Sequence, residues 1–166
     1  KWLRRLEVGD QPWAQREETS KYTDLLENGI ARRHTFQMDV KSVITSPSPQ
    51  APVAHGSGPL VITGLAWTGG GTIKRVDVSI DGGRNWRTAR LDGPSLPKAL
   101  HRFYLDIDWD GSELLLQSRA IDDAGYIQPT KDELRAARGV NSIYHNNGIQ
   151  TWQVRQDGVV ENVEVS

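Results

Sequence analysis

The stretch at residues 59–91 constrains the possible fold most, because apolar and polar positions alternate along it over consecutive short segments. Every second position in its first two segments carries an apolar or β-branched side chain: Val61, Thr63, Leu65 and Trp67, then Val76, Val78 and Ile80. A period of two is typical of half-buried strands. The turn residues at 69–71 and 81–83 separate the segments and tolerate positive φ. We therefore predict three antiparallel strands in a meander, inside a β-sandwich.

Further short strands are predicted before and after this stretch. The same patterning covers residues 35–45, 102–107 and 114–122, and a last hairpin of residues 149–155 and 159–165. In the segment 114–122 we expect one face to carry Leu114, Leu116, Ser118 and Ala120. The predicted helix covers residues 131–138 (KDELRAAR) and ends at Gly139. The predicted fold class is all-β: an immunoglobulin-like (E-set) antiparallel β-sandwich with an irregular N-terminal extension.

The first 34 residues do not follow the sandwich pattern. Trp2, Trp13 and Tyr22 are spread among many charged residues, and neither a strand period nor a helix period holds over a full window. Because a segment this polar cannot form a core of its own, we expect residues 1–34 to order by packing on another surface.

Composition excludes several classes of function. The net charge is −1, with 20 Lys and Arg against 21 Asp and Glu, which gives no electrostatic argument for nucleic acid or an anionic membrane. No apolar run approaches the length that spans a bilayer. The chain has no Cys, so disulfides, thiolate metal sites and Cys nucleophiles are excluded within it. Since it starts at Lys1, either a targeting segment is removed or the chain is a piece of a longer one.

Two motifs resemble ligand-binding loops, but each has a simpler structural interpretation. Asp106, Asp108 and Asp110 match the opening of a calcium loop, yet Gln117 stands where a bidentate Glu is required. A polar strand face that runs into a turn explains these carboxylates without metal. The triple glycine at residues 69–71 lacks the spacing of a phosphate-binding loop and predicts a hairpin turn.

The spacing of the histidines and of the paired carboxylates also favours structural roles over catalytic or metal-binding ones. His34, His55, His101 and His145 have none of the spacings of a zinc site. We predict that His145 is a hydrogen-bonded structural residue. Asp122 and Asp123 would face opposite sides of a strand, so a turn with side chain to backbone bonds fits them better than a shared proton.

Arg102 is the strongest candidate for binding a small anion. It lies near Lys98 and His101, where a loop is expected to enter a strand, and a guanidinium can bind a carboxylate, sulfite or sulfate with two parallel hydrogen bonds. The alternative is an ordinary surface cation. Taken alone, the residues predict a sandwich without self-contained catalytic machinery.

Several sequence runs resemble the sulfite oxidase family. Lys1-Trp2-Leu3 resembles the end of that family's molybdenum-cofactor domain. The pattern at residues 64–86, which contains the triple glycine and ends in D-G-G-R-N-W, resembles the start of its C-terminal molybdenum-cofactor oxidoreductase dimerisation domain. The A-I-D-D run at residues 120–123, followed by Gln128-Pro129, is similar to a further family segment.

Within this family the chain is most similar to the molybdenum subunit of bacterial sulfane dehydrogenases, SoxC, through residues 17–24 and 141–152. The resemblance implies that residues 1–34 are the tail end of an upstream molybdenum-cofactor domain and that residues 35–166 are the dimerisation domain. The family's molybdenum-ligating Cys is absent from this chain, so the segment alone is expected to bind no cofactor and to be inactive.

The resemblance also implies site residues and partners. Lys1 matches the family's lysine for the pterin phosphate of a molybdenum-molybdopterin cofactor, a role that needs the intact protein. Arg102 is the nearest match to the family's arginine that contacts the substrate anion. The implied activity is the oxidation of sulfane or sulfite sulfur, on a sulfur-carrier protein or a small anion, by a periplasmic homodimer that passes electrons to cytochrome c.

Two other functions remain open at this point. An autonomous immunoglobulin-like module that binds a ligand or carbohydrate would use exposed aromatic rings, for which Trp13 and Trp109 are candidates. A complete small enzyme is the third possibility. For a dimer, we expect apolar side chains on one sandwich face and the segment 140–152 to meet their symmetry mates.

Overall fold

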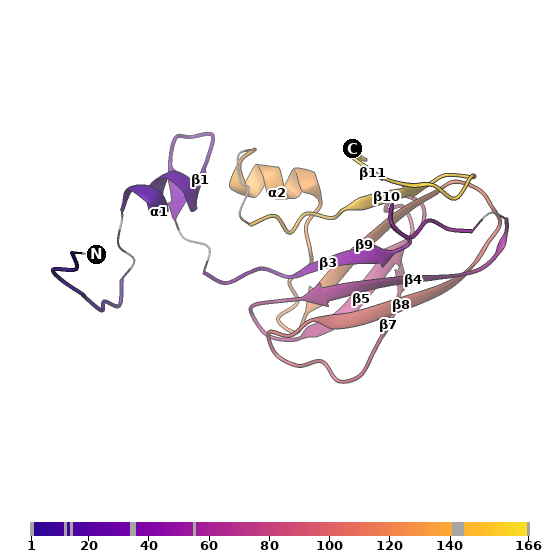
Figure 1. The fold of residues 1–166 in the computed structure, drawn as a ribbon, viewed down its shortest axis with the longest axis horizontal. Helices are drawn as coiled ribbons and strands as arrows, with labels where there is room; N and C mark the ends of the chain where they lie inside the picture. The colour runs from indigo at the N-terminus through magenta and orange to yellow at the C-terminus, as the bar shows by residue number, and fades with distance from the viewer. Residues whose placement is uncertain are drawn as a thin grey trace.

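The computed structural model describes residues 2–11, 13, 15–33, 36–54, 56–140 and 145–165. Nine of the strands in this part of the chain form two facing antiparallel sheets (Figure 1). One sheet consists, in spatial order, of β3 (Lys41–Ser46), β4 (Gly58–Trp67), β8 (His101–Trp109) and β7 (Arg90–Leu91). The other consists of β11 (Val160–Val163), β10 (Thr151–Val154), β9 (Leu114–Asp122), β5 (Ile73–Ser79) and β6 (Arg87–Thr88). The predicted all-β antiparallel sandwich is confirmed, and its immunoglobulin-like subclass stays a prediction.

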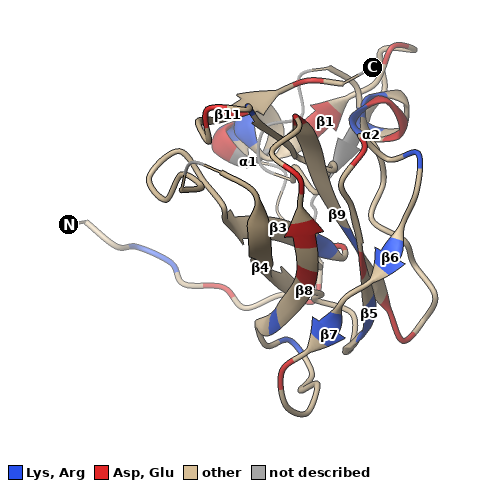
Figure 2. Ribbon diagram, turned by 90° about the vertical axis from the view of Figure 1, so that its right-hand side faces the viewer, with Lys and Arg blue, Asp and Glu red and all other residues tan. Residues whose placement is uncertain are grey.

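The core lies between the two sheets, which Figure 2 shows as separate layers. Strand alternation directs one face of each long strand inward. The hydrophobic side chains with no exposed surface come from both sheets: Ile62, Ala66, Phe103, Val76, Val78, Leu116, Ala120 and Val154. The face of β9 predicted to carry Leu114, Leu116, Ser118 and Ala120 is the inner one, because all four residues are buried. Burying a large aliphatic or aromatic side chain stabilises a fold by roughly 1.5–3 kcal/mol, so this layer holds the sheets together.

The meander predicted at residues 59–91 is confirmed for its second and third strands, which pair as β5 and β6, but its first strand does not pair with its second. β4 pairs with β3 and β8, whereas β5 pairs with β9 and β6 in the opposite sheet. Residues 68–72 therefore form a corner between the sheets and not a hairpin turn. The corner is tightly packed: the Gly69 amide donates to the Met38 carbonyl at 2.8 Å, and a Cβ on Gly71 would lie 2.3 Å from Asp123 Oδ1. Strand periodicity is the same whether the next strand pairs locally or crosses over, so it could not reveal the corner.

The segment before the sandwich also differs from the prediction. The strand expected at residues 35–45 begins only at Lys41, and Phe36 and Met38 are 79% and 50% exposed. Within the expected irregular extension the chain forms α1 (Arg16–Lys21) and a small antiparallel pair, β1 (Thr23–Leu25) and β2 (Ala31–Arg33). In Figure 1 these elements extend beyond the sandwich, next to α2 (Lys131–Arg138).

The predicted helix at residues 131–138 is confirmed as α2. Thr130 caps its start with a reciprocal pair of bonds to Glu133, and Gly139 ends it with a φ of 80°. The predicted final hairpin is also confirmed by the pairing of β10 with β11. Among the described residues no helix is long and apolar enough to cross a membrane.

Candidate functional site

Arg102 lies near the start of β8, on the outer face of the four-stranded sheet. Its neighbours His101 and Phe103 face the core, so the period of the strand directs Arg102 outward, opposite Leu65 on β4. The side chain is exposed, and the backbone carbonyl accepts the amide of Asp92 at 2.9 Å. An exposed guanidinium at a sheet end is accessible to an anion. Its role as an anion contact stays a prediction.

The loop before Arg102 positions the two neighbours that were predicted with it. Lys98 has a φ of 58°, and its amide donates to the Gly71 carbonyl at 3.0 Å, which holds the loop against the corner between the sheets. Lys98 lines a cavity of about 370 Å³ with Phe36, Met38 and Trp67. His101 is 5% exposed, and neither ring nitrogen has a hydrogen-bond partner. The structure therefore separates these residues: Lys98 lines this cavity, His101 faces the core, and Arg102 faces solvent.

The remaining sequence candidates have structural roles or lie outside the described residues. Lys1, the predicted pterin-phosphate contact, is one of the residues that the structure does not describe. Asp106 and Asp108 are exposed on β8, while Asp110 Oδ1 accepts the Ser112 amide at 2.9 Å. These contacts confirm a polar strand face that runs into a turn. His34 and His55 also lie outside the described residues.

Asp122 and Asp123 have separate partners, as predicted. Asp122 Oδ1 accepts the Tyr126 amide at 2.9 Å, while Asp123 Oδ2 accepts the amide and hydroxyl of Thr72 at 3.2 and 2.8 Å. Asp122 thus holds the loop after β9, and Asp123 holds the corner between the sheets. The two carboxylates do not share a proton. Trp109, expected as an exposed ring, is only 4% exposed, because the strand period directs it into the core.

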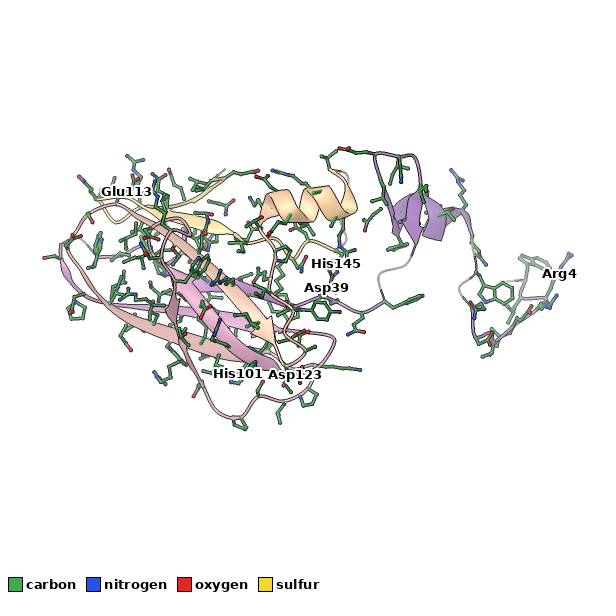
Figure 3. All side chains as sticks on the ribbon, turned by 180° about the vertical axis from the view of Figure 1, so that it is seen from behind. Arg4, Asp39, His101, Glu113, Asp123 and His145 are labelled. Atoms are coloured by element: carbon green, nitrogen blue, oxygen red, sulfur yellow. The ribbon has the colours of Figure 1, made fainter. Side chains whose placement is uncertain are left out.

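The most elaborate polar arrangement in the described part of the chain centres on Arg138, at the end of α2. Its Nη1 donates to Asp24 Oδ2 at 3.0 Å and its Nη2 to Asp39 Oδ2 at 2.8 Å. His145 Nε2 lies 2.9 Å from the same Asp39 oxygen. We call these four residues the Arg138 cluster. Figure 3 shows Asp39 and His145 close together near α2, which confirms the predicted structural role of His145.

Burial makes the Arg138 cluster sensitive to the loss of any member. Arg138 and His145 are each 5% exposed and Asp24 is 9% exposed. Burial lowers the pKa of His145 most, the charge of Arg138 lowers it further, and Asp39 acts in the opposite direction. The cluster thus joins β1, the segment before β3 and the end of α2 through charges that are costly to leave unpaired.

Sequence reasoning missed Asp24, Asp39 and Arg138. Arg138 looked like an ordinary cation in the last turn of a helix, where it suits the helix dipole. Its carboxylate partners lie 114 and 99 residues away along the chain. No local spacing could have paired them.

The donor atoms of this chain do not fit a molybdenum centre. The sequence has no Cys to supply a thiolate. Among the described residues no group of three or more His, Asp or Glu side chains could hold a metal ion. We therefore derive no chemical step at a metal from these residues.

Comparison with known proteins identifies the relatives of this fold. Sulfite oxidase from Gallus gallus is 34% identical over 144 residues, which cover 78% of this chain and 30% of that protein. Mitochondrial sulfite oxidase from Homo sapiens is 37% identical over 100 residues, which cover 56% of this chain and 18% of that protein. The crystal structure of the sulfane dehydrogenase SoxCD from Paracoccus pantotrophus matches with a TM-score of 0.92 and 69% identity, over 100% of this chain and 43% of that chain.

These matches confirm the predicted resemblance to sulfite oxidases and sulfane dehydrogenase. The chain spans less than half of the length of each of these relatives. The model of the Mo-co oxidoreductase dimerisation domain family matches residues 32–152, which include β3 to β9 and the first two residues of β10. On this match, the chain belongs to the Mo-co oxidoreductase dimerisation domain family.

Proposed function

We propose that this chain is the C-terminal, dimer-forming part of a molybdenum-dependent sulfur oxidoreductase of the sulfane dehydrogenase type. The observation that carries this proposal is the 69% identity, over the whole chain, to a chain of a sulfane dehydrogenase with the same fold. Identity at this level over a complete domain is far stronger support than a shared fold, which by itself does not imply function.

In this proposal the catalytic metal is held elsewhere in the protein. The dimerisation domain has no thiolate donor, so a molybdenum-molybdopterin cofactor would be bound by an upstream domain, and residues 1–166 alone would be inactive. The boundary between the two domains would lie near residues 34 and 35. Support comes from the first residues of the chain, where Trp2, Leu3, Leu6 and Val8 are between 78% and 94% exposed. Such apolar surface is typical of a contact with another domain.

The same proposal assigns the partners and the location. Two copies of the domain would form a two-fold dimer. The outer face of the four-stranded sheet offers a suitable surface, since alternation directs the half-buried Val43, Leu65 and Trp67 outward next to the exposed Val61. The reduced sulfur would be carried by a protein or would be a small anion. Cytochrome c would accept the electrons, and the protein would act in the periplasm.

The proposal is tested with the full-length protein. Purified protein is assayed for molybdenum per chain and for the reduction of cytochrome c with sulfite, thiosulfate or a sulfane-loaded carrier protein as electron donor. We expect about one molybdenum per chain and turnover with at least one of these donors, and residues 1–166 alone should show neither. A full-length protein that holds molybdenum but oxidises none of the sulfur donors would refute the proposed activity.

A further inference from the structure

A cavity of about 500 Å³ lies where the segment before β3, the loop after β9 and α2 meet. Its lining includes Met38, Asp122, Tyr126, Glu133 and Asn147. We call it the Asp122 cavity. It contains two buried polar side chains, those of Asp122 and Asn147, and the Asn147 oxygen has no hydrogen-bond partner among the described residues.

Asp122 is the first of these groups. Its side chain is 3% exposed and accepts the Tyr126 amide at 2.9 Å and the Thr68 hydroxyl at 3.4 Å. Within the described part of the chain no Lys, Arg or His forms an ion pair with it. A buried carboxylate without a cation is costly, since two neutral donors replace little of its hydration.

Asn147 is the second group. It is 4% exposed, and its Nδ2 donates to the Val40 carbonyl at 3.1 Å. Because a carbonyl can only accept, this bond fixes which end of the amide is the oxygen. The Oδ1 is then buried without a hydrogen-bond partner. A buried acceptor of this kind favours a donor that enters from outside.

The charges around the cavity also call for a cation. Three carboxylates line it, from Asp39, Asp122 and Glu133, against the single guanidinium of Arg138. That guanidinium is already engaged by Asp24 and Asp39. Among the described residues, Glu133 accepts hydrogen bonds from the amide and hydroxyl of Thr130 alone. Acceptors with negative charge are thus in excess, and a cationic donor would complement them.

The rim of the cavity indicates that the donor belongs to a protein. Met38, Tyr126 and Ile127 line the cavity and are 50%, 72% and 57% exposed. Aromatic and Met side chains around a polar centre that loses water on binding are typical of the energetic centre of a protein interface.

We propose that the Asp122 cavity receives a Lys side chain from a partner protein. The ammonium group donates to Asp122, Glu133 and Asn147 Oδ1, and the residues that flank the lysine in the partner pack on Met38, Tyr126 and Ile127. An ammonium group suits the site because it has three donors and no acceptor. This inference does not depend on the proposed activity, since none of its residues is assigned to sulfur chemistry.

The test compares two peptides with the full chain by isothermal titration calorimetry. One is acetyl-Ala-Leu-Lys-Leu-Ala-amide, and the other has norleucine in place of lysine, which keeps the alkyl chain and removes the ammonium. We expect the lysine peptide to bind at least about fivefold tighter than the norleucine peptide, because only the lysine peptide can form charge-assisted hydrogen bonds in the cavity. Equal binding of the two peptides, or binding of neither, overturns the proposal.

A matched pair of variants locates the effect. Glu133→Gln removes one charge from the cavity and keeps the helix cap, since Gln serves at that position as well as Glu. It should reduce the preference for lysine about threefold or more, whereas Glu113→Gln, exposed and outside the lining of the cavity, should leave it unchanged. An unchanged preference in Glu133→Gln, or a crystal with saturating peptide that shows only water on Asn147 Oδ1, contradicts the proposed site.

Discussion

Arg138 joins the N-terminal elements to the end of α2 through its ion pairs. It is almost fully buried and reaches carboxylates on β1 and on the segment before β3. Arg138→Met removes the cation and leaves Asp24 buried without it, so the free energy of unfolding should fall by about 3 kcal/mol or more. Urea unfolding measures this loss. The matched control is Arg135→Met, one turn earlier. It removes exposed ion pairs to Asp132 and Glu164, and should change the free energy of unfolding little. Equal effects of the two substitutions would contradict the importance of the cluster.

His145 gives the same cluster a pH dependence. Burial and Arg138 lower its pKa below the ordinary 6.5, so the unfolded chain takes up a proton at a higher pH than the folded chain. Stability should therefore fall as the pH decreases below about 6.5, until the folded imidazole is protonated as well. Asp24, Asp39 and Arg138 are the charged groups that face the ring. His145→Gln should lack this part of the slope in urea unfolding between about pH 7.5 and 5. Identical slopes for both proteins would show that His145 does not carry it.

Arg102 is tested through substrate binding. If it contacts the sulfur anion, Arg102→Gln in the full-length enzyme should raise KM about tenfold or more, since a charged, forked contact is lost. Arg87→Gln, which removes another exposed guanidinium from a strand, is the control and should leave KM unchanged. An unchanged KM in Arg102→Gln would place the residue among ordinary surface cations.

At the scale of elements, β4 depends on a glycine in its interior. A Cβ on Gly64 would lie 2.1 Å from Phe103 Cζ and 2.3 Å from the Val43 carbonyl, so β4 cannot approach both neighbours with any larger residue. Gly64→Ala should lower the free energy of unfolding by at least about 2 kcal/mol, because a filled core must shift. Gly93→Ala is the control, with a φ of 73° but no atom within 4 Å of its Cβ, and should cost about 1 kcal/mol. Urea midpoints that rank the two variants in the opposite order would contradict the close packing of β4.

Local patterns predicted the elements well and their partners poorly. Spacing, caps and turn residues within about a dozen positions were enough to predict the helix at residues 131–138, the residues that share one face of β9, and the hairpin of β10 and β11. Contacts between distant segments determine the corner at residues 68–72 and the strand pairs β4–β8 and β5–β9. Local periodicity contains no information about such contacts. The Arg138 cluster was missed for the same reason, because His145 and Asp39 lie 106 residues apart in sequence.

At the scale of the whole molecule, the chain combines a sandwich with a closed core and apolar surface that no other described part of the chain covers. The core between the sheets is closed, with side chains such as Phe103 and Leu116 fully buried. The first residues, in contrast, expose Trp2 and Val8 almost completely. A stable core next to uncovered apolar surface is expected of a domain that functions within a larger assembly.

The central claim is that this domain joins two copies of the protein, as its family assignment describes. Sedimentation equilibrium of the full-length protein, over a range of concentrations, tests it most directly. We predict twice the mass of one chain at micromolar concentration, and a two-fold interface whose loss by substitution of Leu65 and Trp67 to Asp yields a folded monomer. A monomer mass at every concentration up to about 100 µM, far above the Kd of a specific dimer, would contradict the account.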